Sequence, residues 1–323
     1  MATLDSHLLP LVCPDCRAAV RVDGDQLLCA AGHVAGQVRD GIADLTRPRE
    51  GMEAELISFW SSSHSYYELA REVNTDYGDA DHVSHRRLVD ALAEAGARSV
   101  LDVGCGTAEL SSVLANRLPG LEYVGVEVSR LALRTAKTLG RPGAFLAADA
   151  ECLPFPDGRF DAVVSLYALE HFAHPKEALA EMARVVRPGG LVGVLTLAYD
   201  RPTGTIPSIR FGVRSLPRRH PVNVAVYVAR RLRFAARQAW KQVRYVVAPS
   251  YMSFELVPRP LVLDEDYRSD MDAVHVVSGR SVLRLLRSHG LTVVETSLPG
   301  GAAGYLRIPF DFRVIARRES PAR

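Results

Sequence analysis

The sequence contains no apolar run long enough to cross a membrane. Its first apolar stretch, residues 8–12, is too short for a signal peptide and follows no basic start. Cysteine is scarce, with five residues in 323, and the odd number argues against a framework of disulfides. These absences disfavour a membrane-spanning protein and a disulfide-rich secreted one, so we expect a cytoplasmic protein.

Acidic residues are missing from one long segment. Residues 201–254 contain eleven Lys and Arg but no Asp or Glu, although the net charge of the whole chain is only +2. A surface of mixed charge, which is usual where a face is merely solvated, is therefore excluded for this segment. The overall composition, 48% hydrophobic and 24% charged, is otherwise that of an ordinary soluble protein.

A third glycine is missing from a glycine-rich turn. The apolar residues 99–103 predict a buried parallel strand, Gly104 and Gly106 predict a tight turn, and a helix is expected to begin at Thr107. Glycine at such a turn lets the backbone approach a ligand and adopts positive φ at little cost. The fingerprint of dinucleotide-binding folds requires one more glycine where this chain has Glu109, so a nicotinamide dehydrogenase is the weaker alternative.

The sequence does have an acidic residue at the end of each of the next two expected strands. Glu127 follows the apolar residues 123–126, twenty-one positions after Gly106. A carboxylate at this position can accept both hydroxyls of a ribose. The plain alternative is an exposed acidic residue at a strand end. Asp149 ends the third strand, where its side chain can meet an adenine amino group.

A fourth motif, Pro-Gly-Gly at residues 188–190, ends a predicted helix ahead of a fifth strand at residues 191–197. In this order and spacing the four motifs resemble those of class I S-adenosylmethionine-dependent methyltransferases, especially the ubiquinone-type branch. The resemblance implies an α/β fold with a Rossmann-like seven-stranded sheet whose last strand is antiparallel, and S-adenosyl-L-methionine as cofactor. The cofactor-binding residues that it implies are Asp102, Gly104 and Gly106 for the methionine half, Glu127 for the ribose, Asp149 and Ala150 for the adenine edge, and Leu166 and Tyr167 beside the sulfonium and the methyl acceptor.

Glu170 and His171, after the fourth expected strand, bear on the methyl acceptor. Members of this branch that methylate small molecules often carry Glu-His or His-His here, so the resemblance makes His171 the candidate catalytic base. An imidazole has a suitable pKa for that role, whereas packing against the next helix is its ordinary structural alternative. His275 is a secondary candidate. The chain lacks the Asn/Asp-Pro-Pro-aromatic tetrad of enzymes that methylate exocyclic amines of nucleic-acid bases, which argues against that chemistry but not against ring-nitrogen methylation.

Three of the five cysteines stand near the N-terminus with metal-ligand spacing. Cys13 and Cys16 form a Cys-x2-Cys pair, and Cys29 with His33 forms a Cys-x3-His pair about a dozen residues later. The pattern predicts a closed, structural zinc site, with free thiols in a flexible leader as the alternative. Together with residues 37–45, it resembles the zinc ribbon of bacterial large-subunit ribosomal RNA guanine-N1 methyltransferases.

These motifs divide the chain into five expected parts. They are a zinc ribbon at residues 1–46, a helical linker or lid at 47–80, a methyltransferase core at 81–197, a basic helical cap at 198–272, and the remainder of the core at 273–323. Aromatic residues of the linker belong either to a substrate lid or to the core. They are Phe59, Tyr66, Tyr67 and Tyr77.

The cap is predicted to contain one long helix, residues 221–247. Its apolar stripe consists of Val224, Val228, Leu232, Ala235, Ala239, Val243 and Val246. Its basic residues, Arg230, Arg233, Arg237, Lys241 and Arg244, fall on the opposite face. Such a helix either packs its apolar stripe on the protein as an ordinary lid, or lies on an anionic membrane or an RNA backbone.

Together, the patterns predict a methyltransferase that uses S-adenosylmethionine to methylate an oxygen, or less readily a nitrogen, of a small-molecule or lipid-like metabolite. Methylation of ribosomal RNA at a ring nitrogen is the alternative that the zinc ribbon and the basic cap favour. A non-catalytic scaffold that keeps the cofactor fold is the third interpretation. Under the lipid interpretation the protein is peripheral to a membrane.

Overall fold

The computed structural model describes residues 10–62, 83–197, 221–248, 250–256, 275–298 and 311–320. Tyr66, Tyr67 and Tyr77, the other aromatic residues named for the linker, lie outside these ranges. So do most of the cap on either side of its helix and residues 308–310, where the sequence predicts that the last strand begins.

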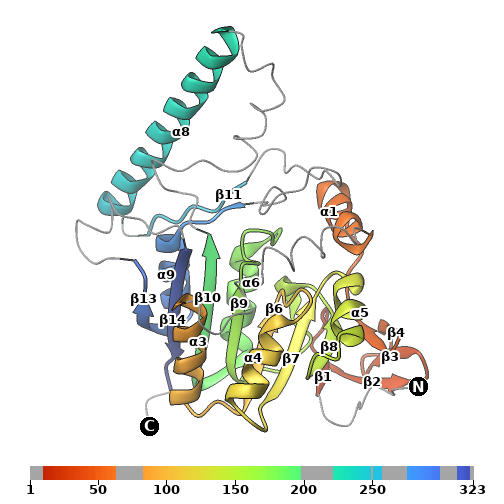
Figure 1. The fold of residues 1–323 in the computed structure, drawn as a ribbon. Helices are drawn as coiled ribbons and strands as arrows, with labels where there is room; N and C mark the ends of the chain where they lie inside the picture. Colours follow the sequence, from red (N-terminus) through yellow and green to blue (C-terminus); the bar gives the residue numbers. More distant parts are fainter. Residues whose placement is uncertain are drawn as a thin grey trace.

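Seven strands form the centre of the molecule, in the order β8-β7-β6-β9-β10-β14-β13 (Figure 1). Their bounds are β6 Ser99–Val103, β7 Glu122–Glu127, β8 Ala144–Ala147, β9 Phe160–Leu166, β10 Val186–Leu197, β13 Leu291–Thr296 and β14 Asp311–Arg318. Only β14 runs antiparallel to its neighbours, β10 and β13. The expected Rossmann-like sheet with an antiparallel last strand is therefore confirmed.

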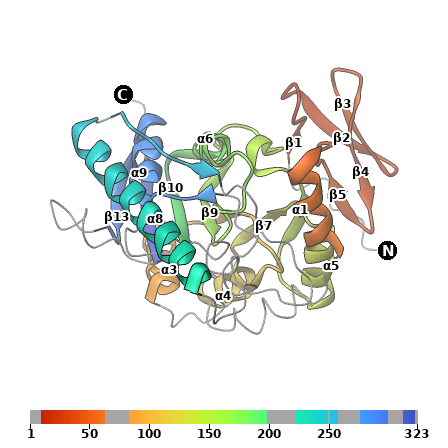
Figure 2. The ribbon, with the colours of Figure 1, turned by 90° about the horizontal axis from the view of Figure 1, so that it is seen from above.

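Helices cover both faces of this sheet (Figure 2). One face carries α3 (Val83–Glu94), α4 (Glu109–Arg117) and α5 (Arg130–Thr138), and the other carries α6 (Pro175–Val185) and α9 (Gly279–Ser288). Because successive side chains of a strand point to opposite faces, Val100 of β6 packs in one hydrophobic layer and Leu101 in the other.

The N-terminal strands continue the same sheet. They form an antiparallel meander of β1 Leu11–Val12, β2 Ala19–Asp23, β3 Gln26–Cys29, β4 Val34–Arg39 and β5 Ile42–Asp44. Strand β5 then pairs in parallel with β8, so that Ala43 lies opposite Leu146, and the sheet reaches twelve strands. Leu27 and Leu45 are buried in the hydrophobic core that also contains Leu146. The expected ribbon is thus built onto the edge of the central sheet.

Two element boundaries differ from those predicted. Helix α4 begins at Glu109 rather than Thr107, because Ala108 has a left-handed φ of 57°. Strand β10 begins at Val186 rather than residue 191, with a shift of register before Leu191, so Pro-Gly-Gly forms a bulge inside the strand. Gly190 is required there, since a Cβ atom would lie 2.5 Å from the carbonyl oxygen of Asp161.

Helix α8 (Pro221–Val247) confirms the long helix predicted in the cap. It lies beyond the upper edge of the sheet in Figure 1, near the short antiparallel pair β11 (Glu255–Leu256) and β12 (His275–Val276), and extends away from it. The described part of the chain contains no helix that is long and apolar enough to cross a membrane.

Helix α8 packs on the protein through a face other than its apolar stripe. Residues buried on this helix are Phe234, Gln238, Lys241, Gln242 and Tyr245. Val228, Leu232, Val243 and Val246, from the expected packing stripe, are exposed instead. The ordinary-lid alternative, in which the apolar stripe packs on the protein and the basic face is solvated, is therefore wrong for these side chains. The side chains of Val224 and Arg230 lie outside the described set.

Candidate active site

The carboxyl ends of β6, β7, β8 and β9 surround one cavity of about 230 Å³. Parallel strands end at the same edge of a sheet, which is where α/β folds bind ligands. The cavity is lined by His171, the first candidate for the base, and by every residue predicted to bind the cofactor: Asp102, Gly104, Gly106, Glu127, Asp149, Ala150, Leu166 and Tyr167.

The turn after β6 is tight, as its glycines predicted, and each of the two glycines is needed for a different reason. Gly104 and Gly106 have positive φ, of 76° and 54°. A Cβ atom on Gly106 would meet nothing within 4 Å, so this glycine leaves space at the cavity. On Gly104 a Cβ atom would lie 2.5 Å from Cβ of Ala168, so close packing of the protein itself demands this glycine.

Asp102 is a buried carboxyl at the end of β6. Its Oδ2 accepts a hydrogen bond of 2.6 Å from the hydroxyl of Tyr123, on the neighbouring strand. Burial raises the pKa of Asp102 to about 7, although the Tyr123 hydroxyl opposes the shift. Glu109 and Glu127 add to the rise by like-charge repulsion. A cationic group of a ligand would relieve this unfavourable position.

Glu127 is fixed by backbone donors at the end of β7. Its Oε2 accepts from the N–H of Gly106 at 3.1 Å, and its Oε1 accepts from the N–H of Ser129 at 3.0 Å. These backbone N–H groups lower the pKa of Glu127, but burial of the carboxyl group has the larger effect and raises it. Because each carboxylate oxygen has two lone pairs, both oxygens can accept a further bond from a ligand hydroxyl.

Asp149, at the end of β8, is already engaged by the segment that follows the ribbon. Its Oδ1 forms an ion pair of 2.9 Å with Arg49, and its Oδ2 accepts from the backbone N–H of Arg47 at 2.9 Å. Arg49 also contacts Glu53 and Glu151, each at 3.2 Å, and lines the cavity. The segment after the ribbon therefore forms the wall at the end of the cavity where Asp149 and Ala150 lie.

One wall of the cavity is apolar and comes partly from α1 (Gly51–Ser62). Leu56, Ile57 and Trp60 of this helix line the cavity, as do Leu166 and Phe172. Trp60 lies edge-on to His171, with ring centroids 6.1 Å apart. Phe59 of the same helix is buried and does not line the cavity, which agrees with the core alternative stated for it. Arg49, Trp60 and His85, which do line it, had no distinguishing signal in the sequence.

Buried polar groups that do not line the cavity form hydrogen bonds with the loop that carries His171. Glu170 is fully buried, and its Oε2 accepts a hydrogen bond of 2.6 Å from Thr196. The carbonyl oxygen of Glu170 accepts from the N–H of His275 at 2.9 Å, and Nδ1 of His275 lies 2.9 Å from the carbonyl oxygen of Phe172. His275 does not line the cavity, so the structure gives this secondary candidate a supporting position behind the loop.

Tyr167 has a strained backbone at the end of β9. Its φ of 51° is unusual for a bulky residue, and its ring lies edge-on to His85 of α3, with centroids 5.8 Å apart. Strained residues concentrate where a site over-determines them. Tyr167 and Leu166, which the resemblance assigns to the sulfonium and the methyl acceptor, both line the cavity.

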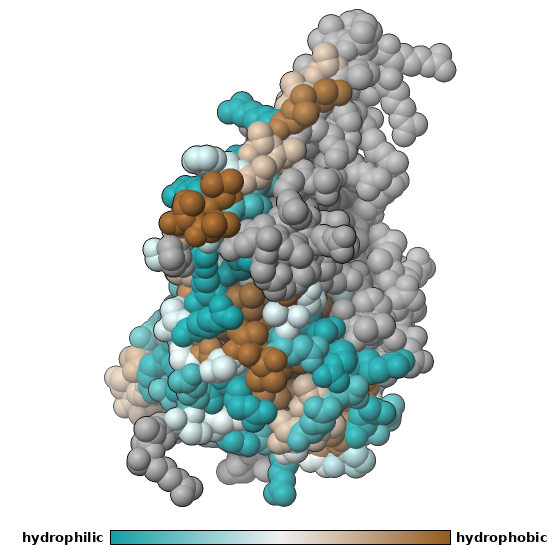
Figure 3. All heavy atoms as spheres, turned by 90° about the vertical axis from the view of Figure 1, so that its left-hand side faces the viewer, coloured by the Kyte–Doolittle hydropathy of each residue, from teal (hydrophilic) through white to brown (hydrophobic). Residues whose placement is uncertain are grey.

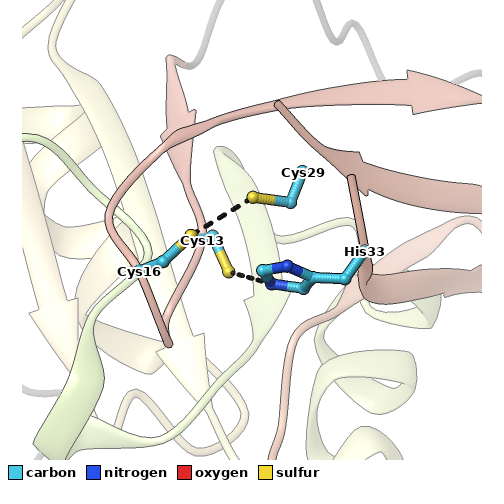
Figure 4. A group of neighbouring side chains, drawn as sticks. All are labelled: Cys13, Cys16, Cys29 and His33. Atoms are coloured by element: carbon cyan, nitrogen blue, oxygen red, sulfur yellow. Dashed lines mark hydrogen bonds between the residues drawn. The ribbon is translucent and has the colours of Figure 1, made fainter. Parts of the chain in front are cut away.

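The four predicted metal ligands converge at the other end of the ribbon (Figure 4). Sγ of Cys13 lies 3.1 Å from Nε2 of His33, and Sγ of Cys16 lies 3.3 Å from Sγ of Cys29. All four donor atoms lie within 4.8 Å of one another. Three thiol sulfurs and one imidazole nitrogen are a donor set typical of structural zinc, and with four protein ligands no position is open to substrate.

The same cysteine knuckle is tied to the core. The N–H of Val12 donates to Pro154 at 3.0 Å, and the Arg17 guanidinium donates to Leu153 at 2.9 Å. Arg47 reaches back to the carbonyl oxygen of Pro14 at 2.5 Å, while its own N–H holds Asp149. The ribbon and the Asp149 end of the cavity therefore form one connected structure.

Part of the chain is similar in sequence to known methyltransferases. Residues 101–194 match the methyltransferase domain family. The chain is 42% identical over 114 residues to a demethylmenaquinone methyltransferase of Thermus thermophilus, covering 34% of this chain and 52% of that protein. It is 28% identical over 193 residues to the chloroplastic tocopherol O-methyltransferase of Arabidopsis thaliana, covering 54% of each.

A solved structure, magnesium protoporphyrin IX methyltransferase from Synechocystis with bound SAM, is 14% identical and covers 85% of this chain and all of that one, with a TM-score of 0.46. The chain spans about half the length of the two curated relatives named above. The sheet and the domain match show a class I methyltransferase fold.

Asp102 should make the stability of the cofactor-free protein depend on pH. Its folded pKa of about 7 exceeds the ordinary 3.8, so between these values the folded state holds a proton that the unfolded state has lost. The stabilisation is fully present below about pH 4 and is lost as pH rises to 7, by up to about 1.4 kcal/mol per pH unit. Urea unfolding of wild type and Asp102→Asn across this range measures it, and a difference independent of pH would contradict the raised pKa.

Cys13→Ser should release the ribbon metal and also loosen the cofactor site, because β5 pairs with β8 and Arg47 holds Asp149. Atomic absorption should show the loss of about one equivalent of zinc, and calorimetry should show weaker S-adenosylmethionine binding. Cys152→Ser, at a buried cysteine outside the cluster, is the matched control for metal content. Full metal retention in Cys13→Ser would refute the ligand assignment.

Proposed function

We propose that this chain, whose residues 101–194 form a methyltransferase domain, transfers a methyl group from S-adenosylmethionine to an oxygen, or less readily a nitrogen, of a small-molecule or lipid-like acceptor. The observation that carries the proposal is a single cavity lined both by carboxyl groups at three neighbouring strand ends and by apolar side chains. When bound, the cofactor supplies an electrophilic methyl group on a sulfonium.

The residues present suit this cofactor. Asp102 is a buried carboxyl whose raised pKa favours a cationic partner, and Glu127 offers two fixed oxygens to hydroxyl groups. Gly106 leaves open space between them. Asp149 retains lone pairs beyond its bonds to Arg47 and Arg49, and Ala150 follows it. We assign these residues to the methionine, ribose and adenine parts in the order that the resemblance implies.

The acceptor is inferred from the apolar side chains that line the cavity. Leu56, Ile57, Trp60, Leu166 and Phe172 suit an apolar body better than a charged one. The relatives are named for demethylmenaquinone and tocopherol, and the latter enzyme is named an O-methyltransferase. An apolar acceptor with a hydroxyl group therefore fits both the cavity and the relatives.

In the proposed reaction, the cavity aligns the acceptor oxygen with the methyl group, and alignment provides most of the acceleration. The transfer would replace the sulfur–carbon bond of the cofactor with an oxygen–carbon bond to the acceptor, and S-adenosylhomocysteine would be the second product. His171 receives the proton of the acceptor hydroxyl. Trp60 borders the imidazole, while Glu170 and His275 hold the loop from behind.

We further propose that Cys13, Cys16, Cys29 and His33 hold a structural zinc ion. Methylation of ribosomal RNA at a ring nitrogen is the second candidate function, supported by the resemblance of the ribbon and the eleven basic residues of residues 201–254. Labelled methyl transfer to ribosomal RNA and not to phenols would favour it. Cofactor binding without transfer to any acceptor would favour the scaffold interpretation.

Glu127→Ala should weaken S-adenosylmethionine binding by about 1–3 kcal/mol, because charge-assisted hydrogen bonds to the ribose are lost. Titration calorimetry measures this affinity. Glu122→Ala, at the other end of β7, should leave it unchanged and serves as the matched control. Equal affinities for wild type and Glu127→Ala would remove Glu127 from the ribose site.

His171→Ala should lower kcat by about 10²–10⁴-fold while cofactor affinity stays within about twofold, because a positioned base acts on the acceptor proton. Labelled methyl transfer to a panel of phenols and hydroquinones gives kcat, and calorimetry gives the affinity. His174→Ala, three positions further along the same loop and paired with Glu53 at 3.3 Å, is the control. A wild-type rate in His171→Ala would make His171 a packing residue.

A further inference from the structure

Helix α8 exposes an unusual concentration of apolar side chains. Of the nine large hydrophobic residues that are exposed among the described ones, six lie on this helix: Val228, Leu232, Trp240, Val243, Val246 and Val247. Their exposed fractions run from 46% to 71%, and Figure 3 shows brown and beige side chains following one another along the helix. A contiguous apolar patch of this kind usually marks an interaction site.

The apolar residues share one side of the helix. At about 100° per residue, Val228, Leu232 and Val243 fall within one narrow arc. The buried residues Phe234 and Tyr245 lie on the opposite side. The helix therefore packs on the protein through one face and presents a separate, continuous apolar face outward.

Specific bonds at its C-terminal end fix this rotation of α8. The hydroxyl of Tyr245 lies 2.6 Å from Oγ of Ser281, on α9. The guanidinium of Arg284 donates to the carbonyl oxygens of Tyr245, Ala248 and Tyr251, at 2.5, 3.1 and 2.6 Å. Since the last turn is held by directional bonds, the outward position of Val243 follows from the fold.

Cations border the apolar face on one side. Arg233, Arg237 and Arg244 are exposed, and Trp240 lies between them and the apolar arc. No Asp or Glu occurs among the 27 residues of the helix. An apolar face, a Trp at its border and a row of Arg beside it are the arrangement of helices that lie in the headgroup region of anionic membranes.

We propose that α8 docks the protein on an anionic lipid bilayer, with the apolar face at the boundary between headgroups and acyl chains and the Arg row on lipid phosphates. An RNA backbone would use the Arg row but would leave the apolar face exposed to water. A second copy of the chain could cover the apolar face, but it would bring the two Arg rows towards each other.

This inference goes beyond methyl transfer and is tested without it. Where the proposed function also holds, the surface would place the cavity next to acceptors dissolved in the bilayer, since α8 and the cavity lie at the same edge of the sheet (Figure 1).

The test is co-sedimentation of the full chain with vesicles of phosphatidylcholine alone and of phosphatidylcholine containing about 30% phosphatidylglycerol. We expect binding to the anionic vesicles that falls about tenfold in Val243→Glu and in Arg233→Ala/Arg237→Ala. Val294→Glu changes another exposed valine, on β13, and should bind as wild type does. Emission from Trp240 should shift to the blue on binding, and Trp240→Phe should abolish that shift.

Calorimetry with S-adenosylmethionine separates this proposal from the proposed function. Unchanged cofactor affinity in Val243→Glu shows that the variant is folded, so lost vesicle binding then supports the docking face. Vesicle binding by Val243→Glu at the wild-type level would overturn the proposal. So would binding to ribosomal RNA but to neither vesicle, or a dimer in light scattering that Val243→Glu dissociates while vesicles remain unbound.

Discussion

Parallel hydrogen bonding among β8, β7, β6 and β9 is the constraint on which the site depends. It brings the ends of four strands, far apart in the chain, to one edge of the sheet, and with them Asp102, Glu127 and Asp149. Burial at this edge raises the pKa values of Asp102 and Glu127, because no solvent balances their charge. The fold thus holds buried, poorly solvated carboxyl groups at a place where a cationic, hydroxyl-rich ligand would stabilise their charge.

The same edge explains why the ribbon is part of the site. Strand β5 adds to β8 in parallel, and the chain after it crosses the end of β8, so Arg47 and Arg49 bind both oxygens of Asp149. The Cys13 knuckle is joined to residues 153 and 154 just beyond Asp149 and Ala150. A metal held by the ribbon would consequently stabilise one wall of the cavity without taking part in the chemistry.

Helix α8 shows how tertiary bonds can override an amphipathic pattern. Its sequence divides into apolar and basic faces, and the usual outcome is burial of the apolar face. Here the hydrogen bonds of Tyr245 to Ser281 and to Arg284 fix the helix in a rotation that turns Val243 outward. Lys241 and two Gln residues are buried instead. Directional hydrogen bonds at one turn were stronger determinants of rotation than the hydrophobic stripe, which leaves the stripe available to a partner.

By itself, the sequence determined the seven-stranded sheet, its antiparallel last strand, the long cap helix and the nine residues around the cavity. Local signals, namely apolar runs of strand length, the glycine-rich turn and carboxyl groups at strand ends, predicted the strands, the turn and the positions of Glu127 and Asp149. The seven-stranded arrangement, its antiparallel last strand and the other residues of the set were what the resemblance to class I methyltransferases implied. The four cysteine and histidine ligands follow from spacing. Only the tertiary structure decided the β5–β8 pairing, the capture of Asp149 by Arg47 and Arg49, the choice of Trp60 over Phe59 and the rotation of α8. Each depends on contacts between segments distant in the chain, whose geometry no local pattern encodes.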